Sequence, residues 1–587
     1  MYNARVREEQ GLTRHRLWQG MILLALFGAV VYGNSLKGTL FWDDEKTIVQ
    51  YDNSLKGTLF WDDEETVVRN VFIRSPKYLK QIFTGSYPIN SGKKANFYRP
   101  VTVLSFLIDY QLWQLKPFGY HLTNVLLHIC NAILLFLLFQ MLFQELKASF
   151  LAGLLFLIHP VNSEVVNYVS SRTDLLYLVF ILAGLMSYVK YRLTRRWIYG
   201  VTVLVSYLLA TCSKEMGLVF PLYCMACEWF LRKDKGSPAA AKPPILLYVG
   251  FAAIFIAYTV LRATALNSLG VNILTQGAQR VPFSQDLLLR LLTSAKAWVI
   301  YIRLFFVPVG LHMDYDPFYV RSRWDADGWL AMGFFIGLMV WAISWSRGDR
   351  RMKFGVVWFL LGLLPVSGII QMKNATSEHF VYLGVAGFFL YIAVAVWRAL
   401  SAIPAPRTRS IFIGCGIGLL MVLGGMTIAR NEVWADPLRF FLDVVSKTER
   451  SYRANNNAGL EYYRKGDYAK AEEYFKRALE IRPANPVVLN NLGLICFKKN
   501  DQDGEEVYYR SAIQLQQDYV VARRNLAGLY IRQKKYPQAL KQIRKVLEYY
   551  PYDAQARRML QGIPKEFLDR VSLPAMDEVG QRGGRQP

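Results

Sequence analysis

An acidic sequence near the start of the chain is written twice. Residues 34–45 read Asn-Ser-Leu-Lys-Gly-Thr-Leu-Phe-Trp-Asp-Asp-Glu, and residues 53–64 repeat them letter for letter. The two copies contain the adjacent aspartates Asp43 and Asp44, and Asp62 and Asp63. An aspartate can take the proton from a hydroxyl group, which is a poor nucleophile at neutral pH. Because both copies follow the first hydrophobic segment, we expect these carboxylates at a membrane–water boundary, where they could serve a transfer reaction from a lipid-linked donor.

Further residues with chemistry lie in short polar sequences later in the chain. The candidates for binding a phosphate or a sugar are Arg99, His159, Glu164, Arg172, Lys214 and Glu215. A departing phosphate needs positive charge, and Arg172 and Lys214 suit that role, with Arg99 as a weaker candidate. His159 and Glu164 are five residues apart, so they do not share one helical face cleanly. They could hold a divalent metal ion or the sugar, and the need for a metal stays open.

These residues also have a structural interpretation. The charged ones, Arg172, Asp174, Lys214 and Glu215, could merely pair with one another and anchor helix ends. His159 precedes Pro160, and such a step could simply end a helix. We favour function because the whole set is expected at the outer ends of helices, on the side of the acidic pairs.

The composition identifies a membrane protein. The chain has 587 residues, 53% of them hydrophobic, and a positive mean hydropathy of +0.17. A membrane helix needs about 20 mostly apolar residues. We expect eleven spans, near Trp18–Tyr32, His121–Phe143, Phe150–Tyr168, Leu175–Tyr191, Ile198–Thr211, Met216–Phe230, Ile245–Leu261, Trp329–Trp345, Phe354–Ile370, Phe380–Trp397 and Ile411–Ile428. A further segment, Leu287–Leu311, is interrupted by Lys296, Arg303 and Pro308, and we expect it to re-enter the membrane or lie in the interface.

Basic residues predict the orientation. They collect in the N-terminal head and near residues 192–196, 232–242, 347–353 and 398–409. Because basic loops stay in the cytoplasm, we expect the acidic loop (36–118) and everything beyond residue 430 on the outer side. The net charge of +25 then reflects this orientation and a basic C-terminal module, and does not indicate nucleic-acid binding. The six cysteines indicate no disulfide framework.

The C-terminal part repeats every 34 residues from about Tyr452. Gly459, Gly493 and Ala527 share one phase, and Glu505 occupies a position where the first copy has the small residue Ala471. This period predicts tetratricopeptide repeats, each a pair of helices. Three repeats and a cap near Ala554–Leu560 would form a short solenoid whose concave face suits a peptide or partner protein.

Together these patterns predict an all-α polytopic membrane protein with a C-terminal helical solenoid. The expected parts are a cytoplasmic head (1–17), a transmembrane domain (18–430), a linker (431–451), the repeat array (452–562) and a disordered tail (563–587).

An ordered set of short motifs spans nearly the whole chain. It comprises Phe-Trp-Asp-Asp, Tyr98-Arg-Pro100, Gly119-Tyr-His-Leu-Thr-Asn124, His159-Pro-x-x-x-Glu164 and Ser213-Lys-Glu215, and the later blocks Leu364-Pro-Val-Ser367, Glu378-His-Phe-Val-Tyr382 and Arg430-Asn-Glu-Val-Trp434. In this order, ahead of a tetratricopeptide array, the motifs resemble the transmembrane and tetratricopeptide-containing O-mannosyltransferase family.

The resemblance implies a membrane fold of the GT-C type and a mannose donor linked to polyprenyl or dolichyl phosphate. It also implies an acidic pair in the first outer loop, the repeat array on the same side, and inversion at the sugar by single displacement with an aspartate base. Bacterial relatives could use other sugars. We expect a bacterial inner membrane with a periplasmic site, or the lumenal side of the endoplasmic reticulum in a eukaryote.

The family pattern has one acidic pair where this chain has two. Asp43 stands at the expected distance after the first helix, whereas the sequence after Asp62 leads into Tyr98-Arg-Pro100 in the family manner. We favour Asp62 as the base and regard one copy as a tandem insertion, which a loop tolerates.

Other functions fit parts of the sequence. Sugar transfer to a lipid or polysaccharide would use the same groups, while the repeats favour a protein acceptor. A non-enzymatic scaffold that displays the repeats would need far fewer helices. A transporter would place its charges at mid-membrane rather than at one face.

Overall fold

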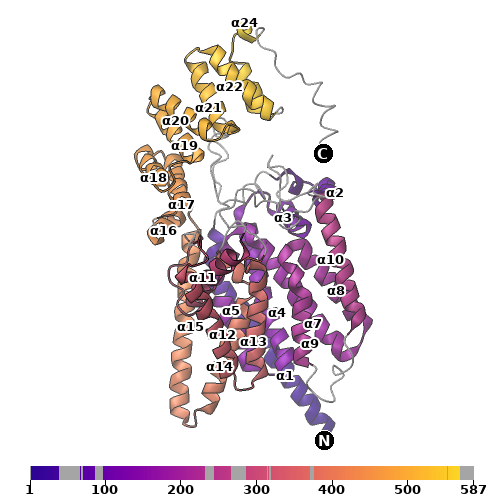
Figure 1. The fold of residues 1–587 in the computed structure, drawn as a ribbon. Helices are drawn as coiled ribbons and strands as arrows, with labels where there is room; N and C mark the ends of the chain where they lie inside the picture. Colours follow the sequence, from indigo (N-terminus) through magenta and orange to yellow (C-terminus); the bar gives the residue numbers. More distant parts are fainter. Residues whose placement is uncertain are drawn as a thin grey trace. The chain divides into compact units, whose positions relative to one another are not determined.

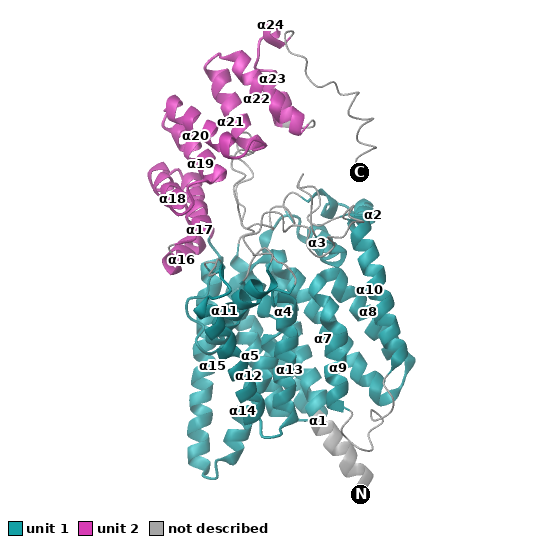
Figure 2. Cartoon of the chain, in the orientation of Figure 1, with its two compact units in different colours: residues 1–41, 61–436 teal, residues 42–60, 437–587 magenta. Residues whose placement is uncertain are grey.

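The computed structural model describes residues 2–38, 67, 70–85, 97–231, 244–265, 286–313, 315, 319–369, 376–448, 450–550 and 553–568. These residues form helices joined by turns, which confirms the predicted all-α class. The chain divides into two compact units (Figure 2): residues 1–41 and 61–436 form unit 1, and residues 42–60 and 437–587 form unit 2. Both acidic pairs, Asp43–Asp44 and Asp62–Asp63, lie outside the described residues.

Unit 1 is a bundle of long helices linked by shorter ones (Figure 1). Its α-helices are α1 (Tyr2–Tyr32), α2 (Leu79–Thr84), α3 (Pro100–Trp113), α4 (Pro117–Phe143), α5 (Leu146–Ile158), α6 (Ser163–Asn167), α7 (Arg172–Thr194), α8 (Trp197–Ser213), α9 (Phe220–Leu231), α10 (Ile245–Ala265), α11 (Leu287–Phe306), α12 (Ala326–Trp345), α13 (Arg350–Leu363), α14 (Val385–Ala402) and α15 (Pro406–Trp434). The 3-10 segments include η6 (Pro160–Asn162), η7 (Val169–Ser171), η8 (Glu215–Val219) and η12 (Glu378–Val381).

The apolar core of unit 1 runs along neighbouring helix pairs. α7 packs against α8, α13 packs against α14, and α4 packs against α1, α5 and α7. The backbones of α13 and α14 approach so closely that a Cβ on Gly355 would lie 2.7 Å from the carbonyl oxygen of Gly387. Small residues permit such contacts between membrane helices. At the end of α13, a Cβ on Gly362 would clash with the Cα of Gly384, so the two ends of the connection that carries η12 lie against each other.

Seven described helices are long and apolar enough to cross a membrane. They are Arg14–Lys37, Pro117–Phe143, Val169–Thr194, Ile245–Ala265, Ala326–Trp345, Val385–Ala402 and Pro406–Trp434. An eighth span would combine Leu146–Ile158 with Pro160–Asn167, which are bent by 53° at a break. The bend arises because the residue before a proline avoids helical backbone, and His159 is extended there. The remaining predicted spans correspond to shorter helices such as α8, α9 and α13, so the count of eleven stays a prediction.

Neighbouring helices of unit 1 run in opposite directions, and this separates the basic turns from the candidate polar residues. α7 runs from Arg172 to a basic turn at residues 195–196, and α8 returns from that turn to Lys214. α13 begins at a basic turn, and its Arg350 donates to the carbonyl oxygen of Trp229 near the end of α9. The basic turns therefore share one end, and the candidate polar residues share the other.

Unit 2 is a tetratricopeptide solenoid, as predicted. Its helices are α16 (Pro437–Lys447), α17 (Tyr452–Arg464), α18 (Tyr468–Ile481), α19 (Pro486–Lys498), α20 (Gln502–Leu515), α21 (Val520–Arg532), α22 (Tyr536–Tyr549), α23 (Ala554–Leu560) and α24 (Lys565–Leu568). α17 to α22 form three helix pairs, α23 packs on the last pair, and α16 packs against α17. The second repeat has a glycine at this position because no side chain would fit there. A Cβ on Gly493 would lie 2.5 Å from the ring of Tyr509.

Glu505 at the small-residue position is accommodated by an ion pair between repeats. Its side chain on α20 is buried, and Nη2 of Arg532 on α21 donates to both carboxylate oxygens at 2.6 and 2.7 Å. Burial raises the pKa of Glu505, and Arg532 opposes that shift. Arg532 of the third repeat therefore offsets the cost of burying Glu505 in the second repeat.

We expect Arg532→Ala to destabilise the second and third repeats by about 3 kcal/mol, because it leaves a buried carboxylate without its cation. Hydrogen exchange of α20 and α21 in the full-length protein measures this effect. Amides that exchange by local opening should exchange about a hundredfold faster.

Arg477→Ala is the control for this experiment. Arg477 pairs with Glu473 on α18, but both side chains are about half exposed, at 49% and 53%. Its loss should cost less than about 1 kcal/mol. Equal effects of the two substitutions would mean that the Glu505 pair contributes no more than a surface pair.

Candidate functional site

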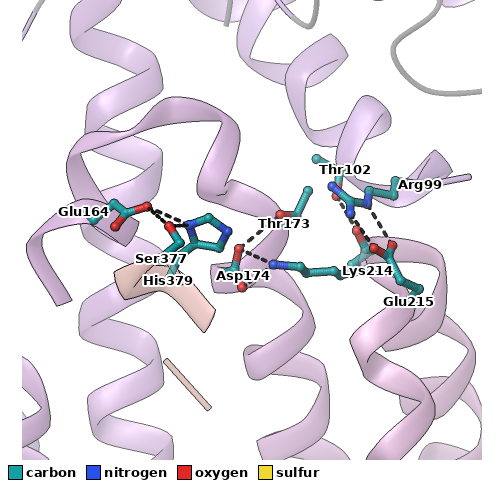
Figure 3. Close-up of polar contacts among 10 residues, drawn as sticks. Arg99, Thr102, Glu164, Thr173, Asp174, Lys214, Glu215, Ser377 and His379 are labelled. Carbon is teal, nitrogen blue, oxygen red and sulfur yellow. Dashed lines mark hydrogen bonds and ion pairs between the residues drawn. The ribbon is translucent and has the colours of Figure 1, made fainter. Parts of the chain in front are cut away.

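Three cation–carboxylate pairs lie at the end of unit 1 opposite the basic turns. They are Arg99–Glu215, Arg172–Asp109 and Lys214–Asp174. Figure 3 shows the first and the last of them. Their members come from α3 and the residue before it, the first turn of α7, and the segment where α8 gives way to η8. The structure therefore brings together four predicted site residues, Arg99, Arg172, Lys214 and Glu215, each with a carboxylate or guanidinium partner.

Lys214 is held by Asp174. Its Nζ lies 2.6 and 2.7 Å from the two carboxylate oxygens, and both side chains are buried. Asp174 is in the first turn of α7, where the helix dipole favours a negative charge. Lys214 is the residue at which α8 ends, and its backbone is extended. The pair fixes a positive charge in place and neutralises it.

Arg99 and Glu215 form the most exposed of the three pairs. Nε and Nη2 of Arg99 donate to the two carboxylate oxygens at 3.0 and 2.7 Å, and the side chains are 12% and 27% exposed. Burial alone raises the pKa of Glu215, but the charge and hydrogen bonds of Arg99 outweigh it and lower the pKa to about 2. Arg99 precedes Pro100, the first residue of α3, so the proline sets the place from which the guanidinium reaches across to η8.

Arg172 is fully buried and joins several helices. Its guanidinium pairs with Asp109 on α3, its Nε donates to the amide oxygen of Asn124 at 2.9 Å, and its Nη2 donates to the carbonyl oxygen of Tyr120 at 2.8 Å. It also lies over the ring of Phe106 at 4.6 Å. These contacts orient the guanidinium toward protein groups on α3 and α4, so the geometry gives Arg172 a positioning role.

His159 and Glu164 have separate partners. Nε2 of His159 lies 3.1 Å from the carbonyl oxygen of Phe305, and its Nδ1 accepts from the backbone N–H of Val161 at 3.2 Å. Both ring nitrogens are thus engaged at the bend after α5. Glu164 on α6 instead contacts the η12 region, where its carboxylate meets Ser377 and His379.

Sequence reasoning assigned no role to several residues that complete this end of unit 1. Asp109 lies within α3, in a stretch expected to be loop, and Ser377 and His379 are more than 200 positions from Glu164 in sequence (separations of 213 and 215). The sequence places His379 only within the block Glu378–Tyr382 of the family resemblance, without a role. Asp109 could have been found as the one acid inside an apolar stretch that follows Tyr98-Arg-Pro100.

Within the described residues, no group of three or more His, Cys, Asp or Glu side chains is placed to hold a metal ion. The two acidic pairs are not among these described residues.

The arrangement consists of oriented cations whose charge is balanced by carboxylates. The partly exposed Arg99 and the nearby Lys214 are each held in place by a carboxylate partner, without a net charge excess. A phosphate that entered would compete with Glu215 for the donors of Arg99, because phosphate and carboxylate suit the same guanidinium geometry.

The two units define a class: a polytopic membrane protein with a charge-paired polar cluster at one end, joined to a tetratricopeptide array. A family model described as TPR repeat matches residues 459–500. Within this class the chain is similar to protein O-mannosyl-transferases, as the motifs predicted.

A protein O-mannosyl-transferase of Caenorhabditis elegans is 25% identical over 476 residues, covering 79% of this chain and 63% of the relative. Human protein O-mannosyl-transferase TMTC3 is 25% identical over 446 residues, covering 69% of this chain and 47% of the relative. The chain therefore spans about half to two thirds of the length of these relatives. The solved structure of an Archaeoglobus fulgidus oligosaccharyltransferase tethered to an acceptor peptide covers 76% of this chain and 58% of that chain, with 13% identity and a TM-score of 0.39.

We expect Arg172→Ala to lower the stability of unit 1 by about 3 to 5 kcal/mol, because it leaves the buried Asp109 carboxylate without its cation. A lower melting temperature of the purified full-length protein would measure the loss. Arg323→Ala is the control, since Arg323 pairs with Asp286 while its side chain is 69% exposed. That change should cost less than about 1 kcal/mol.

The Arg99–Glu215 pair predicts a pH dependence. Because the pKa of Glu215 is lowered in the folded protein, its stabilising contribution is present above about pH 4.5, the usual range of a glutamate, and is lost as the pH falls toward 2. Glu215→Gln should therefore melt below wild type at pH 6, and the difference should shrink at pH 3. A difference that stays constant between these pH values would contradict the pairing.

Proposed function

We propose that this chain is a membrane glycosyltransferase that moves a sugar from a polyprenyl-phosphate donor to Ser or Thr hydroxyls of exported proteins. The sugar is mannose or another hexose. The observation that carries the proposal is the similarity to protein O-mannosyl-transferases over 476 residues. The charged cluster supports it, because such a reaction needs cations beside the phosphate. Unit 1 is proposed to have the GT-C architecture that the family resemblance implies.

Chain connectivity supports a role for the acidic pairs at this end of unit 1. Val67 is buried in one apolar cluster with Phe106 and Tyr120, the residues next to Arg172. In the sequence, Asp63 is four residues before Val67, and Asp43 is five residues after Gly38. Gly38 lies so close to His121 that a Cβ on it would be 2.8 Å from that ring. The described residues that flank the acidic pairs therefore belong to this end of unit 1.

The proposed reaction is a single displacement. Asp62 takes the proton from the acceptor hydroxyl, and the hydroxyl oxygen attacks the anomeric carbon of the sugar. The bond between that carbon and the phosphate oxygen breaks, and its electron pair stays on the departing phosphate. The anomeric configuration inverts, and no sugar–enzyme bond forms.

Arg99 and Lys214 are proposed to receive the phosphate. Arg99 is the more exposed of the two, so we expect the donor to meet its guanidinium and weaken the bond to Glu215. Lys214 adds a second charge from a fixed position. Arg172 holds α3 and α4 in register behind them and acts as a positioning residue.

The repeat array is proposed to bind the acceptor or a partner protein on the outer side of the membrane. α15 ends at Trp434, whose ring stacks on Tyr168 at 6.4 Å, close to the start of α7. The chain therefore leaves unit 1 at the end that holds the polar cluster. This supports an acidic loop and repeats on one side, either the bacterial periplasm or the lumen of the endoplasmic reticulum.

Reconstitution of the full-length protein in lipid nanodiscs tests the proposal. The protein is mixed with polyprenyl-phosphate mannose or glucose and a Ser/Thr-rich peptide, and mass spectrometry reads the peptide. We expect a hexose to be added by the wild type. Replacing the base should slow the transfer at least a hundredfold, so Asp62→Asn/Asp63→Asn should fail and Asp43→Asn/Asp44→Asn should remain active.

Failure of the other double variant alone would keep the function and move the base to Asp43 or Asp44. Transfer that is unaffected in either double variant, and in the variant that combines all four changes, would remove the aspartate base from the mechanism. A wild-type protein that binds the peptide but transfers no sugar from either donor would contradict the proposal and favour a scaffold.

A further inference from the structure

A second polar centre at the same end of unit 1 is built around Glu164. Its carboxylate is completely buried. It accepts hydrogen bonds from the Ser377 hydroxyl at 2.8 Å, from the backbone N–H of Glu378 at 3.0 Å, and from Nδ1 of His379 at 2.6 Å. A carboxylate with no exposure accepts three donors from one short segment, so it fixes that segment and the imidazole on it.

The segment itself is locked from the other side. The hydroxyl of Tyr301 on α11 donates to the carbonyl oxygen of Ser377 and accepts from its backbone N–H, both at 3.0 Å. The hydroxyl of Tyr315 donates to the carboxylate of Glu378 at 2.7 Å. The position of His379 is therefore set by backbone and side-chain contacts from α6, α11 and the residues after α11.

The hydrogen bond to Glu164 determines which ring nitrogen of His379 is available to a ligand. Nδ1 is committed to the carboxylate, with the Ser377 hydroxyl 2.8 Å away. Within the part of the chain that the structure describes, Nε2 makes no hydrogen bond, and the side chain is 19% exposed. Figure 3 shows the ring on the side of Glu164 that faces the Lys214–Asp174 pair.

We propose that His379 is a donor-contacting residue, and that its Nε2–H donates a hydrogen bond to a phosphate oxygen of the polyprenyl-phosphate sugar. This inference rests on the proposed function and names a residue for it. In the doubly protonated ring both nitrogens donate, Nδ1–H to Glu164 and Nε2–H to the phosphate.

Charge balance explains why such a donor is needed. Arg99, Arg172 and Lys214 each have a carboxylate partner, so the three pairs carry no net positive charge. A phosphate that gains a second negative charge as the sugar leaves needs a directed donor that it does not have to win from a carboxylate. Glu164 is the positioning residue, because it touches the imidazole and not the phosphate.

Binding and turnover are measured separately to test this role. Full-length protein in nanodiscs is titrated with polyprenyl phosphate, and transfer is then measured with the sugar-carrying donor. We expect His379→Gln and Glu164→Gln to bind polyprenyl phosphate about tenfold more weakly, the worth of one charged hydrogen bond. The KM for the donor should rise by a similar factor, while the KM for the acceptor peptide stays unchanged. His379→Arg keeps a cation and should retain most of the affinity.

His15→Gln is the matched control, since His15 is exposed on α1 and far from this centre in sequence. Melting temperatures identify any variant that fails to fold. If folded His379→Gln binds polyprenyl phosphate as tightly as wild type, the inference is wrong while the proposed function stands. Equal losses in His379→Gln and His379→Arg would also overturn it, because they indicate a packing role. A wild-type protein that neither binds polyprenyl phosphate nor transfers sugar would contradict the proposed function itself.

Discussion

The end of unit 1 opposite the basic turns depends on one buried guanidinium. Arg172 is the first residue of α7, and its contacts with Asp109, Asn124 and Tyr120 join α7 to α3 and α4. Asn124 in turn donates to the carbonyl oxygen of Val166 at 3.2 Å, so the short α6 is part of the same network. An unpaired charge in an apolar bundle is costly, so only the arrangement that satisfies the arginine is stable. Apolar packing alone would allow these helices many alignments. The polar contacts of Arg172 therefore determine how the helices that carry the other site residues are aligned.

The polar cluster combines fixed charges with little excess charge. Each cation is held by an acid at short distance, which keeps the long side chains from adopting several conformations. Donors held in this way are oriented before any ligand arrives, so little orientation has to be gained on binding. The buried Glu164 likewise orients the neighbouring connection between α13 and α14, whose ends are held together by the close contact of Gly362 and Gly384.

The fold class and the repeats could be predicted from the sequence because they rest on local patterns. Apolar segments and a 34-residue period are visible without knowing any long-range contact. The set of polar residues at one end could also be predicted, from helix direction and basic turns. Their partners could not, since Glu164 and His379 are 215 positions apart and no spacing rule links them. The apolar pattern does not show the 53° bend after His159, because composition alone makes that segment continuous.

The ion pair between Glu505 and Arg532 has a consequence for how the repeat array can change over generations. The carboxylate occupies a place built for a small side chain, and it is compatible with the fold because a neighbouring repeat supplies the opposite charge. Losing the arginine first would strand the acid, whereas losing the acid first leaves an arginine that is already 42% exposed. The order of the two substitutions therefore matters. A standard repeat can be reached without a stranded charge only if Glu505 is replaced before Arg532.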